Sequence, residues 1–169
     1  MERATKIVSE MIVQRGYTIT DKNDDNIIAV NSDNKKIVFI TTPVIKFNSD
    51  KTKEYVSLSR KMGISHFIIV YKDCVTPMSK KLIIQLSCDF ILELFHIDEL
   101  QYNITKHKLV PQHIKISDNE AKEFKKKYGL RYPTILKTDP IARFYYYQKG
   151  DIIKIVRNNG YVTYRIVKG

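Results

Sequence analysis

The sequence predicts two domains: an α/β domain over residues 1–98 and a smaller mixed α+β domain over residues 99–169. Helical and strand-like segments alternate through the first part, which is typical of layered α/β structure. A boundary falls near residues 96–105, and the chain beyond it ends in two β-rich runs around an Asn-Gly turn. A chain of 169 residues is long enough to bury one compact core or two small ones.

In the first domain, apolar spacing and turn residues define the expected elements. Ile7, Val8, Met11 and Ile12 share one face of a helix over residues 3–15, and Gly16 is placed to end it. The following elements are then expected: strands near 26–31 and 36–41 around a polar turn at 32–35, a helix over 51–62 capped by Ser49-Asp50 and stopped by Gly63, a buried strand over 66–71, a helix opened by Thr76-Pro77, and a strand over 89–95.

The second domain is expected to begin with a short strand at 114–116. Ser117 and Glu120 have the spacing of a capping box, which predicts a helix to about residue 127, ended near Gly129. Asp139-Pro140 opens another short helix, because proline is tolerated at the first helical position. The runs 151–157 and 161–168 flank Asn159-Gly160, a strong signal for a β-hairpin.

The net charge of +11 is concentrated in the second domain. Residues 1–98 carry 14 Lys and Arg against 12 Asp and Glu, whereas residues 99–169 carry 15 against 6. Such an excess favours nucleic acid or an acidic protein as a partner. The apolar runs are too short to cross a bilayer, and the N-terminus lacks the apolar core of a signal peptide. Cys74 and Cys88 are too few for a zinc site, which favours a reducing intracellular compartment.

The sequence contains no convincing constellation of catalytic residues. The four histidines, His66, His96, His107 and His113, lack metal-ligand spacing with the cysteines, and we expect His107 and His113 to serve packing or hydrogen bonding. The weak exception is a nuclease-like pattern of Asp24 or Asp25 followed by Asp33 and Lys35, which could hold Mg²⁺. Asp33 and Lys35 fall in a predicted turn, however, where such side chains are ordinarily solvated.

Two further segments leave alternatives open. The helix after Thr76-Pro77 has Lys80 and Lys81 in its first turn and no acid there. A bound phosphate would make these lysines favourable, but a plain capped helix with solvated lysines is the simpler alternative. The aromatic run from Phe144 to Tyr147 could stack bases, although a mixture of core and protein interface is the more ordinary role for such a run.

The segment from Asn103 to His113 is similar to a linker pattern, close to N-I-T-x-H-x-L-V-P-x-H, in the fifth subunit of eukaryotic-type DNA-directed RNA polymerases. The three nuclear polymerases share that subunit, and every fixed position of the pattern is present here. Further similar stretches are Asp139 to Arg143, Gly150 to Arg157, Tyr161 to Arg165, Arg15 to Tyr17, and Val75 to Lys80. The resemblance spans roughly residues 5–168.

The resemblance implies a non-catalytic subunit without metal or cofactor. Its C-terminal assembly domain, which a small archaeal polymerase subunit shares, would dock on the largest subunit beside neighbouring small subunits. Its N-terminal domain would form part of the lower jaw, with a restriction-endonuclease-like fold that lacks the catalytic acids. The implied contacts with downstream duplex DNA, weak and confined to the assembled complex, are Thr76, Pro77, Ser79, Lys80 and Lys81. The implied subunit interface is Asp139, Pro140, Ile141, Arg143, Tyr145, Arg157, Tyr164 and Arg165.

Two departures from the family pattern bear on the source. The jaw part is shorter around residues 20–50, and the alanine that follows the loop serine in the family is replaced by Lys80. Isoleucine, lysine and asparagine are abundant (24, 22 and 9 residues), as an A·T-rich genome would give. These features favour a homologue from a large DNA virus, located in the virion or host cytoplasm, over a nuclear protein of a protist. The rival functions are a stand-alone nuclease-like DNA-binding protein and a free transcription regulator.

Overall fold

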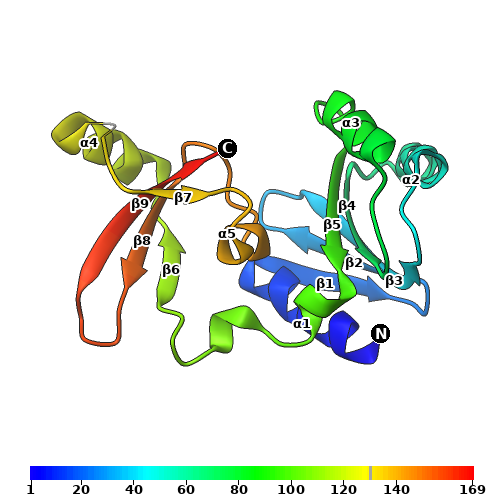
Figure 1. Ribbon diagram of the computed structural model, residues 1–169, viewed down its shortest axis with the longest axis horizontal. Coiled ribbons are helices and arrows are strands. Elements are labelled where there is room, and N and C mark those ends of the chain that lie inside the picture. Colours follow the sequence, from blue (N-terminus) through cyan, green and yellow to red (C-terminus); the bar gives the residue numbers. More distant parts are fainter. Residues whose placement is uncertain (130) are drawn as a thin grey trace. The chain divides into compact units, whose positions relative to one another are not determined.

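The computed structural model describes residues 1–129 and 131–169, which divide into two compact units (Figure 1). Unit 1 comprises Met1–Tyr102 and unit 2 comprises Asn103–Gly169. The division lies four residues beyond the position expected from sequence. Leu100 is buried, and the short 3-10 helix η1 (Ile97–Leu100) that carries it packs against the first helix. This turn therefore belongs to unit 1.

Unit 1, all of whose residues are described, contains a five-stranded mixed sheet. Its helices are α1 (Glu2–Gln14), α2 (Ser49–Met62) and α3 (Pro77–Gln85), and its strands are β1 (Tyr17–Lys22), β2 (Asn26–Asn31), β3 (Lys36–Val44), β4 (His66–Tyr71) and β5 (Ile91–His96) (Figure 1). The strands lie in the order β1-β2-β3-β4-β5. Neighbours in the first three are antiparallel, whereas β3, β4 and β5 run parallel.

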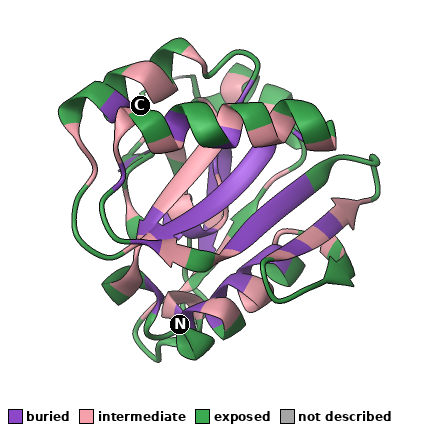
Figure 2. Cartoon of the chain, turned by 90° about the vertical axis from the view of Figure 1, so that its right-hand side faces the viewer, coloured by how far each residue is buried: buried purple, intermediate pink, exposed green. Residues whose placement is uncertain are grey.

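The central strands β3 and β4 form the core of unit 1. Val38, Phe67 and Ile69 belong to a buried cluster that also takes in residues of α2 and of the α3 region. The alternate residues Phe39 and Ile68 are fully buried as well, and they point to the opposite face because side chains alternate along a strand. Both faces are therefore covered, which explains the continuous apolar run of β4. In Figure 2 the buried residues lie mainly on strands, and the helices show exposed outer faces.

Helix α2 begins two residues earlier than the sequence predicts, at Ser49 instead of residue 51. Its N-cap is Asn48, whose side chain accepts a hydrogen bond from the backbone N–H of Lys51 at 2.9 Å, so Ser49 and Asp50 are not the cap. An extended asparagine before the first turn satisfies an otherwise unpaired helical N–H group. The helix ends at Gly63 in the left-handed conformation (φ 62°), as expected from its sequence position.

The described residues of unit 2 form a four-stranded mixed sheet with two α-helices. Its helices are the 3-10 turn η2 (Ile104–Lys106), α4 (Asp118–Tyr128) and α5 (Pro140–Phe144), and its strands are β6 (Gln112–Lys115), β7 (Thr134–Leu136), β8 (Ile152–Val156) and β9 (Val162–Lys168). The strands lie in the order β6-β8-β9-β7, with β7 parallel to β9 and the other pairs antiparallel. The prediction of an α/β domain followed by a smaller α+β domain is thus confirmed in its general form, as two units that each contain a mixed sheet with helices.

Local signals in unit 2 produce the predicted elements. Ser117 accepts a hydrogen bond from the backbone N–H of Glu120, and Glu120 accepts one from the backbone N–H of Ser117, which is the predicted capping box. The β8–β9 hairpin turns at Gly160 (φ 78°), a conformation that glycine adopts without steric cost. Among the described helices, none combines the length and apolar composition that crossing a bilayer requires.

Candidate functional site

The start of α3 is held in place by the loop that precedes α2. The backbone N–H of Thr76 donates to the carbonyl of Phe47 at 3.0 Å, and Phe47 also forms a parallel bridge with Val75. The Thr76 hydroxyl accepts from the backbone N–H of Ser79 at 3.3 Å, which makes it the predicted N-cap, and Pro77 occupies the first turn. Pro77, Lys80 and Lys81 are exposed. A defined helix end therefore presents two lysines to solvent.

Ser79 has a different environment from the lysines that follow it. Its side chain is fully buried, and its hydroxyl accepts a hydrogen bond from Thr52 of α2 at 3.3 Å. Ser79 thus contributes to the packing of α3 on α2. Because a buried side chain is not available to DNA, the expected contact surface at this helix reduces to Thr76, Pro77, Lys80 and Lys81.

The acidic residues of the nuclease-like pattern do not come together. Asp24 and Asp25 precede β2, whereas Asp33 follows it in the turn to β3. Six strand residues separate these positions, which corresponds to roughly 20 Å. In the turn, the Asn31 side chain accepts hydrogen bonds from the backbone N–H groups of Asp33 and Lys35. Carboxylates placed at opposite ends of a strand cannot share one Mg²⁺ ion, because its ligands lie about 2 Å from the metal.

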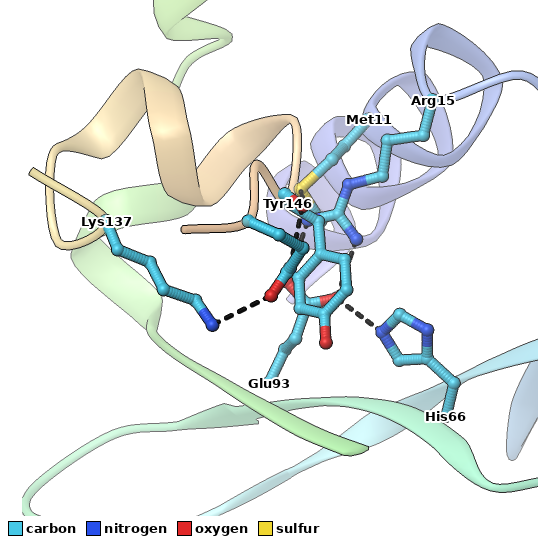
Figure 3. A network of polar contacts seen from close by, with 7 residues as sticks. Met11, Arg15, His66, Glu93, Lys137 and Tyr146 are labelled. Atoms are coloured by element: carbon cyan, nitrogen blue, oxygen red, sulfur yellow. Dashed lines mark hydrogen bonds and ion pairs between the residues drawn. The ribbon is translucent and has the colours of Figure 1, made fainter. Parts of the chain in front are cut away.

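A buried polar network that sequence reasoning missed lies inside unit 1. Arg15 donates to both carboxylate oxygens of Glu93 at 2.7 and 2.8 Å, and the His66 ring nitrogen lies 2.6 Å from one of them (Figure 3). Burial by itself would raise the pKa of Glu93, but the charge of Arg15 and the hydrogen bonds from His66 and Arg15 hold it below its ordinary value. The network joins the end of α1 to β4 and β5, so its evident role is structural. Glu93 is the single carboxylate within the largely apolar strand β5, and this position was the one signal in the sequence that indicated a buried ion pair.

The linker motif of unit 2 is explained by local hydrogen bonds. Asn103 is buried, and its side chain accepts from the backbone N–H and the hydroxyl of Thr105 at 3.0 and 2.6 Å. His107 accepts from the backbone N–H of Leu109 at 3.2 Å, and a ring nitrogen of His113 lies 2.8 Å from the Pro111 carbonyl. The prediction that both histidines serve hydrogen bonding is confirmed. Burial is the main cause that lowers the pKa of His113.

Helix α5 is capped by Asp139 and is followed by aromatic residues that pack on one another. The Asp139 carboxylate accepts from the backbone N–H of Ile141 at 2.9 Å, so it caps α5, and Pro140 follows it at an exposed position. Ile141 is buried, whereas Arg143 is half-buried.

The aromatic residues after α5 are partly committed to the fold. Tyr145 stacks on Tyr147 with ring centroids 5.3 Å apart. The Tyr147 hydroxyl donates to the carbonyl of His113 at 3.1 Å, which ties this segment to β6. Burial raises the pKa of both tyrosines. Phe144 and Tyr147 are therefore core residues, whereas Tyr145 and Tyr146 are half-buried and retain some accessible surface.

The closing hairpin presents its arginines to solvent. Arg157 and Arg165 are exposed, one at each side of the β8–β9 turn. Tyr164 is half-buried and packs on Phe124 of α4 with ring centroids 4.9 Å apart. Of the residues expected at the subunit interface, Pro140, Arg157 and Arg165 are thus exposed, whereas Ile141 is buried and the Asp139 carboxylate caps α5.

Comparison with known proteins covers almost the whole chain. Residues 102–167 match the family model described as RNA polymerase Rpb5, C-terminal domain. The "Putative DNA-directed RNA polymerase subunit 454R" of Invertebrate iridescent virus 6 is 36% identical over 183 residues, which cover 98% of each chain. The chain belongs to the Rpb5 family of RNA polymerase subunits.

Cellular members of the Rpb5 family are similar over comparable lengths. The DNA-directed RNA polymerases I, II, and III subunit RPABC1 of Caenorhabditis briggsae is 28% identical over 198 residues, covering 98% of this chain and 94% of its own. The corresponding subunit of Dictyostelium discoideum is 33% identical over 144 residues, covering 80% of this chain and 72% of its own. The predicted family is confirmed, and this Rpb5-family chain is accordingly a non-catalytic subunit. Among the described residues, no cluster of His, Cys, Asp and Glu could hold a metal ion.

Proposed function

We propose that this chain is a structural subunit of DNA-directed RNA polymerase that docks on the largest subunit, beside neighbouring small subunits, through unit 2. In this proposal unit 1 forms part of the lower jaw and contacts downstream DNA. The observation that carries the proposal is the unequal distribution of charge. Unit 2 has 15 Lys and Arg against 5 Asp and Glu, whereas unit 1 has 14 against 13.

The proposed docking surface centres on the exposed arginines of the β8–β9 hairpin. Arg157 and Arg165 can each form paired hydrogen bonds with a carboxylate of the partner. Arg143 and Tyr145, both half-buried, extend this surface next to α5. An acidic or carbonyl-rich region of the largest subunit would complement such a surface in charge and in geometry.

The proposed DNA contact lies at the start of α3. Thr76 and Pro77 are fixed by the loop before α2, and Lys80 and Lys81 are exposed in the first two turns. A phosphate there would meet the positive end of the helix dipole together with two ammonium groups. Because unit 1 carries almost no net charge, this contact is local and weak without the rest of the polymerase.

We also infer that unit 1 has the restriction-endonuclease-like fold implied by the family resemblance. Its antiparallel β1-β2-β3 segment, followed by parallel β4 and β5 through helical connections, supports this assignment. The separation of Asp25 from Asp33 along β2 argues against retained nuclease chemistry. In this proposal the fold serves as a scaffold for DNA contact only.

Co-purification with the polymerase tests the docking assignment. The double variant Arg157→Glu/Arg165→Glu places acids where the arginines lie, and we expect its incorporation into tagged polymerase to fall at least tenfold. Asp139 is a poor choice for this test, because its carboxylate caps α5 and its loss would also perturb the fold. Lys108→Glu/Lys126→Glu makes the same charge change at exposed positions of unit 2 outside the proposed surface.

We expect the lysine control to incorporate normally. Equal incorporation of the arginine variant and the control would contradict the docking assignment. A circular dichroism spectrum and urea midpoint of each free variant, matched to the wild type, exclude misfolding as the cause of lost assembly.

A further inference from the structure

A lysine-lined hollow of about 330 Å³ lies within unit 2, between one face of α4 and the loop that leads into β8. It is lined by Lys115, Ile116, Asp118, Ala121, Lys122, Lys125, Lys149, Gly150, Asp151 and Ile152. None of these residues belongs to the docking or DNA-contact sets proposed above. The hollow therefore requires a separate explanation.

The wall formed by α4 follows from helical spacing. Asp118, Ala121, Lys122 and Lys125 lie three or four residues apart, so they share one face of the helix. Ala121 lacks the bulk of its neighbours, which leaves room between the lysine side chains. On its other side, α4 is anchored by Phe124, whose ring packs against Tyr164. The positions of the lysine backbones are therefore fixed by packing.

In the opposite wall of the hollow, the Asp151 carboxylate is already engaged by other groups of the protein. One carboxylate oxygen of Asp151 pairs with Lys115 at 2.9 Å, and the other accepts from the backbone N–H of Gln148 at 2.8 Å. Within the described part of the chain, no ion pair engages Lys122, Lys125 or Lys149. Three lysines outside any ion pair of the described residues thus line the hollow, and Asp118 supplies the one further carboxylate among its described lining residues.

We propose that this hollow binds a phosphate group carried on a protein side chain, such as phosphoserine. Three to four lysines around one small volume suit a compact dianion with several acceptor oxygens. Lysine is a compact point charge with three rotatable donors and is a common phosphate ligand, and several lysines together can surround a phosphate from more than one side. No arginine is among the described residues that line the hollow.

Nucleic acid fits the same hollow less well. A nucleic-acid strand is bound by a groove that follows its backbone, usually with aromatic side chains on which bases stack. The aromatic residues of α4, Phe124 and Tyr128, pack against each other with ring centroids 4.9 Å apart, and no aromatic residue is among the described residues that line the hollow. The occupant is therefore a single phosphorylated side chain of a protein partner.

Fluorescence anisotropy with the full-length protein tests this proposal. The probe is a labelled, uncharged peptide with one phosphoserine, and the comparison probes carry serine or glutamate at that position, or are a short single-stranded RNA. We expect the phosphopeptide to bind at least tenfold more tightly than either other peptide. Lys122→Glu/Lys149→Glu should reduce its affinity at least tenfold. Lys122→Gln/Lys149→Gln, which removes the two charges without adding acids, should also reduce the affinity.

The matched control is Lys126→Glu/Lys168→Glu, which makes an identical charge change at exposed positions outside the hollow. We expect this control to change affinity less than threefold. Equal weakening by both double variants would overturn the proposal, because binding would then depend on the overall charge of the protein and not on this hollow. A lack of preference for phosphoserine over glutamate, or tighter binding of the RNA, would also overturn it. None of these results bears on docking, since the arginines of the hairpin are untouched.

Discussion

Arg15 at the end of α1 and Glu93 in β5 form a bidentate ion pair, with both nitrogen–oxygen distances below 3 Å and the two side chains only 3% and 9% exposed. The residues are 78 positions apart in sequence. The pair therefore ties the first helix to the last strand of the unit 1 sheet, and His66 of β4 completes the tie.

We expect Glu93→Leu to destabilise unit 1 by about 3–5 kcal/mol, because it removes the carboxylate that compensates the charge of the buried Arg15 guanidinium. The double variant Arg15→Met/Glu93→Leu should recover much of this loss, since it removes both charges together. Native-state hydrogen exchange of the β4 and β5 amides measures the effect within unit 1. If the double variant were as unstable as the single one, the charge of Arg15 would not be the cause.

The same pair predicts a loss of stability in acid. The folded-state pKa of Glu93 is lowered below 4.5, its ordinary value. The ionised carboxylate therefore contributes stability that is present above that value and disappears as pH falls through the folded-state pKa. We expect the urea midpoint of the wild type to fall between about pH 5 and pH 3 more steeply than that of Glu93→Gln. Parallel declines would show that other carboxylates control acid unfolding.

The contrast between local and long-range features explains what the sequence could predict. The Ser117–Glu120 capping box, the Asn159-Gly160 turn and the Thr76 cap depend on neighbours in the chain, and each forms as predicted. Strands β1 and β7 were not predicted. β1 is largely exposed and β7 has three residues, so their strand character comes from pairing with β2 and β9.

The candidate sites show the same contrast between features that depend on local sequence and features that depend on long-range contacts. The exposure of Lys80 and Lys81 agrees with their position in the first turns of α3, which local pattern can indicate. The burial of Ser79 depends on Thr52, 27 residues away, and the Arg15–Glu93 pair spans most of unit 1. The lysine-lined hollow likewise needs α4 and the Gly150 loop to meet. Contacts of this kind follow from the tertiary fold and have no local sequence signal.

Tyr147→Phe should destabilise unit 2 by about 1 kcal/mol, because it removes the hydrogen bond to the carbonyl of His113 while keeping the ring stacked on Tyr145. Hydrogen exchange of the β6 and β8 amides measures this change. Tyr161→Phe, at an exposed position beside the hairpin turn, removes the same group and should have almost no effect. A comparable loss in both variants would contradict a specific role for the Tyr147 hydroxyl.

The arrangement of acids in unit 1 predicts that the protein does not cleave DNA. With Asp25 and Asp33 at opposite ends of β2, we expect incubation with plasmid DNA and Mg²⁺ or Mn²⁺ to give no cleavage above a protein-free control. Asp25→Ala/Asp33→Ala distinguishes intrinsic activity from contamination. Metal-dependent cleavage by the wild type that this variant lacks would establish the rival nuclease function.

The proposed jaw contact predicts a change in salt dependence that appears only in the assembled polymerase. Each phosphate contact contributes about 0.9 to the slope of log affinity against log salt, so Lys80→Ala/Lys81→Ala should reduce that slope by about 2 for downstream DNA. The lifetime of elongation complexes at several salt concentrations provides the measurement. Lys53→Ala/Lys61→Ala removes two exposed lysines from α2 and should leave the slope unchanged.

For the free subunit we expect weak duplex binding in every variant, because unit 1 is nearly neutral. An unchanged slope in polymerase that contains the Lys80 and Lys81 variant would remove α3 from the DNA contact, while leaving the family assignment and the docking through unit 2 intact.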